Sequence, residues 1–230
     1  MKILGLQKLS LLDFPGKVAC IVFTGGCNFR CPFCHNGDLV TGEGEPQALS
    51  KQEIFDFLKK RQGVLDGVVI TGGEPLLHAD LPEFVQQVRA LGYAVKLDTN
   101  GYLPDRLKAV VEGGLVDMVA MDVKNAPEKY AETTGLASVD VERIKESIAF
   151  LLSADIDVEF RTTVVKELHS PQDIVGAARM IEGAKKYFLQ NFRPSETVIC
   201  DGLSAFSSQE LQGFLQKVRE IVPNAQIRGE

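Results

Sequence analysis

The chain lacks a long apolar run, an excess of positive charge and a recognisable export signal. None of its apolar stretches approaches the ~18 residues that span a membrane, so we expect no membrane contact. The opening MKILGLQKLSLLDFPGK has no continuous apolar segment and no small-residue cleavage site, which indicates a soluble cytoplasmic protein. The net charge of −6 argues against nucleic acid as a partner, because proteins that bind the phosphate backbone cluster lysine and arginine.

Cysteine is scarce, with five in 230 residues. Without an export signal, these cysteines are not expected to form a disulfide framework, and a metal or catalytic role is favoured. The length suits one domain with a sizeable core. We therefore predict a single domain over residues 18–230, with residues 1–17 as an N-terminal extension that packs on it.

Short apolar, β-branched segments alternate with longer segments of helical spacing. This alternation predicts an α/β fold with a parallel sheet and crossover helices. Helix starts are marked at Ser50, with Glu53 three residues on, and at Ser170, with Pro171 and Asp173 following. Strands are predicted at 18–23, 67–71, 93–98, 117–123, 157–165 and 186–192, and helices near 50–62, 80–91, 104–112, 140–152, 171–182 and 207–221.

About six βα units fit an open partial TIM barrel, although a doubly wound sheet has the same local pattern. In both architectures ligands bind at the carboxyl ends of the strands, so the polar segments after the strands are the candidate site. The longest segment without a predicted element is 124–140, a candidate mobile or partner-contacting loop.

The segment GGCNFRCPFCHN, residues 25–36, places three of the five cysteines within eight positions, at Cys27, Cys31 and Cys34. Structural zinc takes four ligands, commonly in two pairs, and no second pair follows here. A cubane iron–sulfur cluster is usually held by four cysteines, so three would leave one iron open to a ligand from outside the protein. The loop is too polar to be core, and a cluster is favoured over zinc.

The motif Cys27-Asn-Phe-Arg-Cys31-Pro-Phe-Cys34, followed by TGGEP after the next strand, closely resembles the radical S-adenosylmethionine superfamily. The longer segment LSLLDFPGKVACIVFTGGCNFRCPFCHN is similar to the activating enzymes of glycyl radical enzymes, most of all those grouped with the anaerobic ribonucleoside-triphosphate reductase activating protein. This resemblance implies a [4Fe-4S] cluster on Cys27, Cys31 and Cys34. It also implies S-adenosylmethionine as cofactor, whose reductive cleavage gives a deoxyadenosyl radical that takes a hydrogen atom from a glycine of a partner enzyme.

The resemblance also implies contacts for the cofactor at the strand ends. Phe33 would flank the adenine, with backbone through Cys34 to His35 beside it, while Gly72, Gly73 and Glu74 would meet the methionine ammonium. The remaining implied contacts, to ribose, carboxylate or a monovalent cation, are Asp98, Thr99, Asn100, Asp122, Lys124 and Arg161.

Several of these residues have simpler interpretations. Asn100 could form an ordinary Asn-Gly turn, and Lys124 could be an exposed lysine at a strand end. Arg161 could pair with Glu159 or another acid instead of the cofactor, since a charge within an apolar strand is costly unless paired. The histidine that the formate-lyase activating branch carries near the sixth strand is absent, so Gln190, Asn191 or Phe192 must replace it. Cys20 and Cys200 are predicted to be structural, free small hydrophobes rather than ligands, and His78 and His169 to have ordinary roles.

Residues 36–68 contain no cysteine, so the thiols suffice for one cluster. Electrons must then come from an outside donor such as a flavodoxin or ferredoxin, and activity is expected to be anaerobic. Two other functions are compatible with the cysteine loop: a radical enzyme of the deazaguanine-synthase type that acts on a small molecule, and a zinc-binding interaction module.

Overall fold

The computed structural model describes residues 1–42 and 47–229. Its strands form a sheet in chain order from β1 to β8. The first pair, β1 with β2, is antiparallel, whereas β2 with β3, β3 with β4, β6 with β7 and β7 with β8 are parallel. The predicted α/β fold is confirmed. The strands are β1 (Ile3–Ser10), β2 (Ala19–Thr24), β3 (Gly67–Gly72), β4 (Ala94–Thr99), β5 (Met118–Asp122), β6 (Asp157–Val164), β7 (Tyr187–Asn191) and β8 (Gln226–Arg228).

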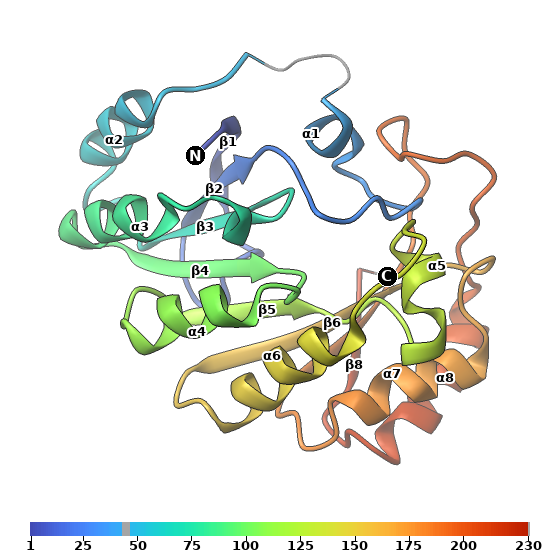
Figure 1. The fold of residues 1–230 in the computed structure, drawn as a ribbon. Coiled ribbons are helices and arrows are strands. Elements are labelled where there is room, and N and C mark those ends of the chain that lie inside the picture. The colour runs from blue at the N-terminus through green and yellow to red at the C-terminus, as the bar shows by residue number, and fades with distance from the viewer. Residues whose placement is uncertain (43–46, 230) are drawn as a thin grey trace. The chain divides into compact units, whose positions relative to one another are not determined.

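Helices connect the parallel strands, and several begin where the sequence predicts (Figure 1). Capping boxes start α2 at Ser50 and α7 at Ser170, as predicted, and a third starts α8 at Ser207. No helix in the described ranges combines the length and apolarity needed to cross a membrane. The helices are α1 (Gly37–Thr41), α2 (Lys51–Lys60), η1 (Pro75–Leu77), α3 (Leu81–Ala90), α4 (Pro104–Glu112), η2 (Pro127–Lys129), α5 (Tyr130–Thr133), α6 (Val141–Ser153), α7 (Pro171–Met180) and α8 (Ser208–Arg219).

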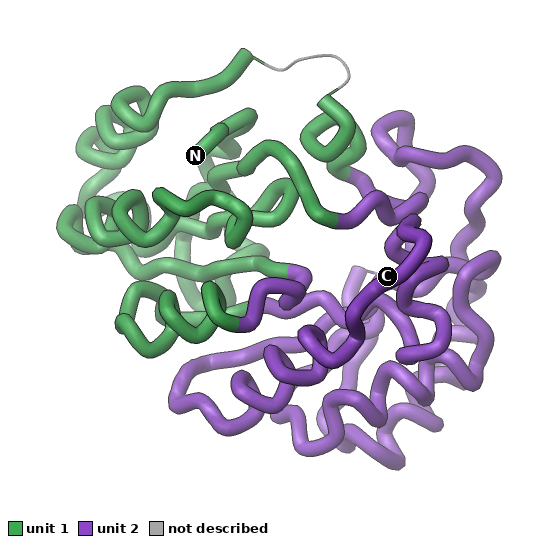
Figure 2. Tube along the Cα trace, in the orientation of Figure 1, with its two compact units in different colours: residues 1–28, 36–99, 105–119 green, residues 29–35, 100–104, 120–230 purple. Residues whose placement is uncertain are grey.

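The chain divides into two compact units, which Figure 2 shows in different colours. Unit 1 comprises residues 1–28, 36–99 and 105–119, and unit 2 comprises residues 29–35, 100–104 and 120–230. Within unit 1, α3 lies beside β4 and α2 beside α3. Within unit 2, α7 lies beside α8, which also contacts β7 and β8.

The N-terminal segment is more regular than predicted. Residues assigned to an extension form the edge strand β1, and Phe14 packs in a buried cluster with Ala19, Ile21, Val69 and Met118. The sequence pattern of β1 hides it, because Leu9 is exposed whereas the polar Ser10 is buried, which breaks the usual alternation. Burial of Phe14 and of Ile3 shows that the segment contributes to the core of unit 1.

Several further short elements were not predicted from the sequence. Strand β8 has three residues and α1 has five, both too short to show a period. The 124–140 segment, predicted to be irregular, contains η2 and α5. Pro127 at the first position of η2 and buried Tyr130 at the start of α5 hold this segment against unit 2.

Candidate functional site

The second half of the cysteine loop is held by backbone hydrogen bonds within unit 2. Cys34 N donates to Cys31 O at 3.0 Å, Arg30 N to Thr134 O at 2.8 Å and Cys200 N to Pro32 O at 2.9 Å. Cys31 is buried, whereas Cys27 and Cys34 are half-buried. The backbone that carries Cys31 and Cys34 is thus held in place within unit 2.

Gly135 permits one of these approaches. Its φ is +67°, and a Cβ there would lie 2.2 Å from Arg30 O. A side chain at position 135 would therefore push the cysteine loop away from the segment after α5.

His35 directly follows the last cysteine and is engaged on both its ring and its backbone. Its Nε2 lies 2.6 Å from Arg193 O, and its carbonyl oxygen accepts a 2.7 Å hydrogen bond from Thr197 Oγ1. The imidazole also lies against Phe192, with ring centroids 5.5 Å apart. The segment after β7 therefore braces the cysteine loop, and Phe192, a candidate replacement for the family's histidine, takes part in that contact.

The TGGEP segment after β3 is built on close backbone approach within unit 1. Gly73 N donates to Thr24 O at 2.8 Å and Glu74 N to Gly26 O at 2.9 Å. A Cβ on Gly73 would lie 1.8 Å from Gly26 O, and Gly72 has φ +115°. Both glycines are required by the geometry of the turn, whatever else they contact.

Glu74 and Asp98 are each tied to neighbours in unit 1. Glu74 is 1% exposed, and its Oε1 accepts from Leu76 N at 3.0 Å and from Thr99 Oγ1 at 2.8 Å. Asp98 Oδ1 accepts from Lys96 Nζ at 2.5 Å. Glu74 thus joins the ends of β3 and β4, and the carboxylate of Asp98 is charge-paired within its own strand.

Asn100 forms the turn that its Asn-Gly sequence predicts. Its Oδ1 accepts from Tyr102 N at 3.0 Å, and Gly101 follows with φ +72°. A Cβ on Gly101 would lie 2.1 Å from Cε of Met121. The Asn-Gly turn is therefore real, and a role toward a ligand stays a prediction.

A cluster of charged side chains in unit 2 joins the end of β5 to β6. Oδ1 of Asp122 accepts a 2.8 Å hydrogen bond from Arg161 Nε, and Oδ2 of Asp122 accepts a 3.0 Å hydrogen bond from Lys124 Nζ. The side chains of Arg161 and Lys124 are only 13% and 15% exposed, so the interpretation of Lys124 as an ordinary exposed lysine is wrong. Arg161 also lies near the other acid that the sequence suggested, with Nη1 3.9 Å from Glu159 Oε1.

These charges shift each other's protonation. Burial alone would raise the pKa of Asp122, but Arg161 and Lys124 outweigh it and hold that pKa well below its usual range. Burial likewise would lower the pKa of Lys124, yet the charges of Asp122, Cys31 and Cys34 hold it well above its usual value. Lys124 is therefore a fixed positive charge close to two of the cysteine thiols.

Phe33 lies near the same lysine. Lys124 Nζ is 6.0 Å from the centroid of the Phe33 ring, and the His169 ring is 6.5 Å from it. His169 Nε2 bonds to Lys124 O at 2.9 Å, and its Nδ1 accepts from Val165 N at 3.1 Å. Burial lowers the pKa of His169, so the imidazole is neutral and supports the backbone beside Lys124.

Two asparagines near the site were missed by sequence reasoning. Asn36 Nδ2 donates to Gly72 O at 3.0 Å, which joins the residue after His35 to the TGGEP turn. Asn125 is fully buried; its Nδ2 donates to Thr133 Oγ1 at 2.7 Å and its Oδ1 accepts from Ala126 N. Both follow a predicted site residue directly, but an asparagine in a turn has too many common uses to be singled out.

The remaining cysteines differ from each other. Cys20 is fully buried in β2, and burial raises the pKa of its thiol to about 12, as expected for a structural cysteine. Cys200 is a free cysteine, as predicted, but it is exposed, so it does not have the structural role in a core that was expected of it. It lies on the irregular segment after β7, where no strand or helix buries it.

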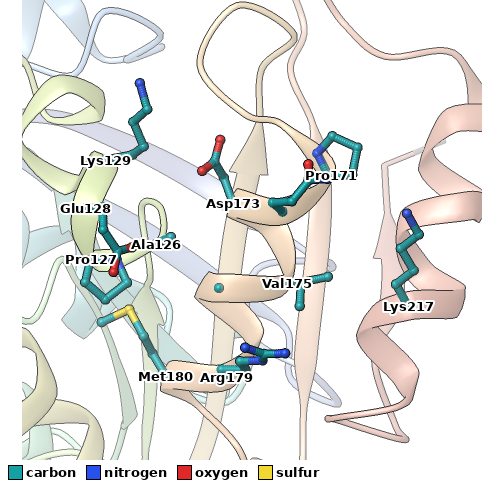
Figure 3. A pocket seen from close by; sticks show the side chains of 12 residues that line it. Ala126, Pro127, Glu128, Lys129, Pro171, Asp173, Val175, Arg179, Met180 and Lys217 are labelled. Carbon is teal, nitrogen blue, oxygen red and sulfur yellow. The ribbon is translucent and has the colours of Figure 1, made fainter.

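A groove of about 720 Å³ lies among η2, α7 and α8 of unit 2 (Figure 3). Lys129, Asp173 and Lys217 are among the residues that line it, and Val175 and Met180 contribute apolar surface. None of the predicted cofactor residues lines this groove, so it is separate from the candidate site.

The residues fit an iron–sulfur cluster better than a single metal ion. Across residues 1–42 and 47–229, no three His, Cys, Asp or Glu side chains are gathered tightly enough to hold one ion. The donor set is three thiols from one loop, and the ammonium of Lys124 lies 6.0 Å from the centroid of the Phe33 ring on that loop. For a monovalent cation the fit is poor, because Asp98 and Asp122 are both paired with lysine.

Comparisons with known proteins agree with this chemistry. The model of the family described as "Radical SAM superfamily" matches residues 21–181. A protein of Methanocaldococcus jannaschii named "Putative glycyl-radical enzyme activating enzyme MJ1227" is 34% identical over 200 residues, 84% of this chain and 80% of that protein. The GTP 3',8-cyclase of Aquifex aeolicus is 29% identical over 217 residues, 91% of this chain and 67% of that enzyme.

A solved structure supports the fold. The radical SAM methyltransferase from Sphaerobacter thermophilus matches with a TM-score of 0.72 and 15% identity, over 96% of this chain and 68% of that one. At this identity the likeness concerns the fold, which is thus shared with radical SAM proteins.

Proposed function

Because the chain belongs to the radical S-adenosylmethionine superfamily, we propose that it is an activating enzyme that generates a glycyl radical in a partner enzyme. The observation that supports radical chemistry is the loop that carries Cys27, Cys31 and Cys34 within eight positions, with the ammonium of Lys124 6.0 Å from the centroid of the ring of Phe33 between the last two cysteines. The choice of a glycyl radical rests on the similarity to the M. jannaschii protein and on the LLDFPGK segment before the loop.

The superfamily implies a [4Fe-4S] cluster and S-adenosylmethionine, which when bound supply a deoxyadenosyl radical able to take a hydrogen atom from glycine. Cys27, Cys31 and Cys34 would hold the cluster as thiolates. Lys124, whose ammonium lies 6.0 Å from the centroid of the Phe33 ring on the same loop, would lend its positive charge to the thiolates of Cys31 and Cys34. The same ammonium is available to a carboxylate, so Lys124 would also orient the carboxylate of the cofactor.

Other residues would orient the rest of the cofactor. Arg161 shares Asp122 with Lys124 and adds a second positive charge for the cofactor carboxylate. Phe33, close to Lys124, would offer its ring to the adenine. The backbone around Gly72 and Gly73 would meet the methionine ammonium, with Thr99 and Asn100 toward the ribose.

The partner would be a glycyl radical enzyme, and an anaerobic ribonucleotide reductase is our first candidate. A flavodoxin or ferredoxin would supply the electron. The test is to reconstitute the protein anaerobically, add S-adenosylmethionine and reduced flavodoxin, and mix it with candidate partners. Electron paramagnetic resonance should then show a glycyl radical. A Cys31→Ala variant and a partner whose radical glycine is replaced by alanine should give no signal.

A second candidate function is radical chemistry on a small molecule, which the similarity to GTP 3',8-cyclase favours. The two functions differ in what becomes radical-modified. If GTP or another small molecule is consumed together with S-adenosylmethionine while no candidate partner acquires a radical, the small-molecule function is correct and glycyl radical activation is wrong.

A further inference from the structure

The geometry points to Glu159 and Arg228 as positioning residues that hold Arg161, Asp122 and Lys124 in the arrangement that receives the cofactor carboxylate. Neither residue is among the predicted contacts. The inference rests on the proposed function, because it takes Lys124 and Arg161 to be cofactor ligands. The short strand β8 thereby controls the affinity for the cofactor through a chain of charged side chains within unit 2.

The chain starts with a two-point ion pair between β8 and β6. Arg228 Nη1 donates to Glu159 Oε1 at 2.9 Å, and Nη2 donates to Oε2 at 2.8 Å. The guanidinium lies over the ring of Phe188, 3.6 Å from its centroid, on the strand between them. The parallel pair of bonds and the stacked ring leave the Glu159 carboxylate little freedom to rotate.

The Glu159 carboxylate is 1% exposed and faces Arg161, two residues along the same strand. Side chains two apart on a strand share a face, so Glu159 and Arg161 lie on one side of β6. Arg161 Nη1 is 3.9 Å from Glu159 Oε1. Water is excluded from this carboxylate, and its charge therefore acts on Arg161 with little screening.

The position of the Arg161 guanidinium fixes the Asp122 carboxylate, and this carboxylate in turn fixes the Lys124 ammonium. Arg161 Nε donates to Oδ1 of Asp122 at 2.8 Å, and Lys124 Nζ donates to Oδ2 at 3.0 Å. Each oxygen of Asp122 thus holds one cation. A shift of the Arg161 guanidinium rotates the Asp122 carboxylate and displaces the Lys124 ammonium with it.

Removing the negative charge of Glu159 would release Arg161 at one end. Its guanidinium would then pair more closely with Asp122, which would be drawn away from Lys124. The predicted consequence is weaker binding of S-adenosylmethionine with an intact cluster, because the backbone hydrogen bonds that hold the loop around Cys31 and Cys34 involve neither Glu159 nor Arg228 nor Lys124.

The test compares Glu159→Gln and Arg228→Met with matched controls from the neighbouring exposed ion pair. Asp157 is on the same strand as Glu159 and pairs with Lys186 at 2.5 Å, but both side chains are exposed. Asp157→Asn and Lys186→Met therefore remove an ion pair between β6 and the start of β7 without touching the chain of charges. The dissociation constant of S-adenosylmethionine is measured by anaerobic equilibrium dialysis on reconstituted protein of known iron content.

We expect Glu159→Gln and Arg228→Met to weaken cofactor binding about fivefold or more, at unchanged iron content, and the two controls to change it less than about twofold. Arg228→Lys should recover part of the loss, since a lysine can still donate to Glu159. The decisive comparison is a double-mutant cycle: in a Lys124→Ala background, Glu159→Gln should cost much less affinity than in the wild type. A general loss of packing would give additive effects instead.

Three results would overturn the inference: unchanged affinity in Glu159→Gln and Arg228→Met, equal losses in the Asp157→Asn control, or additivity with Lys124→Ala. If Glu159→Gln does not fold, Arg228→Met, at a partly exposed position, gives the same comparison. Glycyl radical formation by the wild type is measured separately. A wild type that binds and cleaves S-adenosylmethionine but activates no partner would refute the proposed partner while the affinity comparison still stands.

Discussion

Asn36 donates a 3.0 Å hydrogen bond from its side-chain amide to the backbone oxygen of Gly72. This bond joins the residue that follows CPFCH to Gly72, the last residue of β3. The Gly72 backbone cannot shift to satisfy its oxygen elsewhere, because a φ of +115° and the close approach of Thr24 fix it. The amide of Asn36 is therefore part of what shapes the TGGEP turn.

Replacing Asn36 with aspartate should destabilise the protein more than replacing it with alanine. Alanine removes one hydrogen bond, at about 1 kcal/mol, whereas aspartate also turns a carboxylate oxygen toward the carbonyl of Gly72, for roughly 2 kcal/mol. Urea unfolding of anaerobically purified protein measures both. Asn224→Asp, at an exposed position, should change the stability by less than about 0.5 kcal/mol. Equal stability of Asn36→Asp and wild type would show that the bond is unimportant.

Replacing any one of Cys27, Cys31 and Cys34 with alanine should abolish cleavage of S-adenosylmethionine and most iron binding. Cys20→Ala and Cys200→Ala should retain both, because the Cys20 thiol is buried and neutral and Cys200 is exposed on a separate segment. Iron content and product formation after reconstitution check this. If Cys200→Ala lost as much iron as Cys31→Ala, the three-ligand assignment would be wrong.

Two glycine-to-alanine substitutions should have opposite effects on stability. At Gly73 the new methyl group would lie 1.8 Å from the backbone oxygen of Gly26, so we expect a loss of about 3 kcal/mol. At Gly213, on the exposed face of α8, nothing lies within 4 Å, and alanine should stabilise by about 0.8 kcal/mol. Thermal unfolding of both variants decides; a Gly73→Ala variant as stable as wild type would mean that the turn relaxes freely.

Acid should destabilise the protein partly through His169. The pKa of His169 is lowered in the folded protein, so the unfolded chain binds the proton more tightly. The stability that neutral His169 contributes is therefore complete when the pH is above the pKa of the unfolded chain, about 6.5. That stability is lost as the pH falls below this value. His169→Gln should therefore show a smaller fall in the free energy of unfolding between about pH 7.5 and pH 5.5 than the wild type does. Parallel pH profiles of the two proteins would exclude His169 as the titrating group.

The reconstituted protein should contain about four irons, the content of a single cubane cluster. Residues 36–68 supply no cysteine for a second one. Iron and sulfide analysis and the spectrum of the dithionite-reduced protein measure this. A reproducible content of about eight irons, with two different reduced clusters, would contradict the single-cluster prediction.

The sequence predicts the regular part of the fold well because the six long strands and their helices have clear periods. Ser50 and Ser170 start helices as predicted, since the capping residues act through contacts three positions away in the chain. Strand β1 was missed, because its pairing with β2 and the burial of Phe14 depend on residues far along the chain. Local patterns carry no information on such contacts.

In the candidate site too, features set by neighbouring residues could be predicted, and features set by distant residues could not. The Cys27, Cys31 and Cys34 spacing lies in eight consecutive residues and could be recognised directly. Arg161 could be flagged as a charge in an apolar strand, but its choice between Glu159 and Asp122 is decided by the register of β6 and the end of β5. Arg228 gave no signal, because β8 has three residues and its partner Glu159 is 69 positions earlier.

The hydrogen bonds that brace the cysteine loop have a consequence for biosynthesis. Its backbone partners, at Thr134, Arg193 and Cys200, are made about a hundred residues or more after the loop itself. During translation, strands β2 to β4 can pair as each leaves the ribosome, because neighbours in the chain are neighbours in the sheet. The loop with Cys31 and Cys34 stays unbraced until residues 193–200 have emerged, and its thiols are open to oxidation for most of that time. Iron and sulfide are thus best delivered to a chain from which residues 193–200 have already emerged.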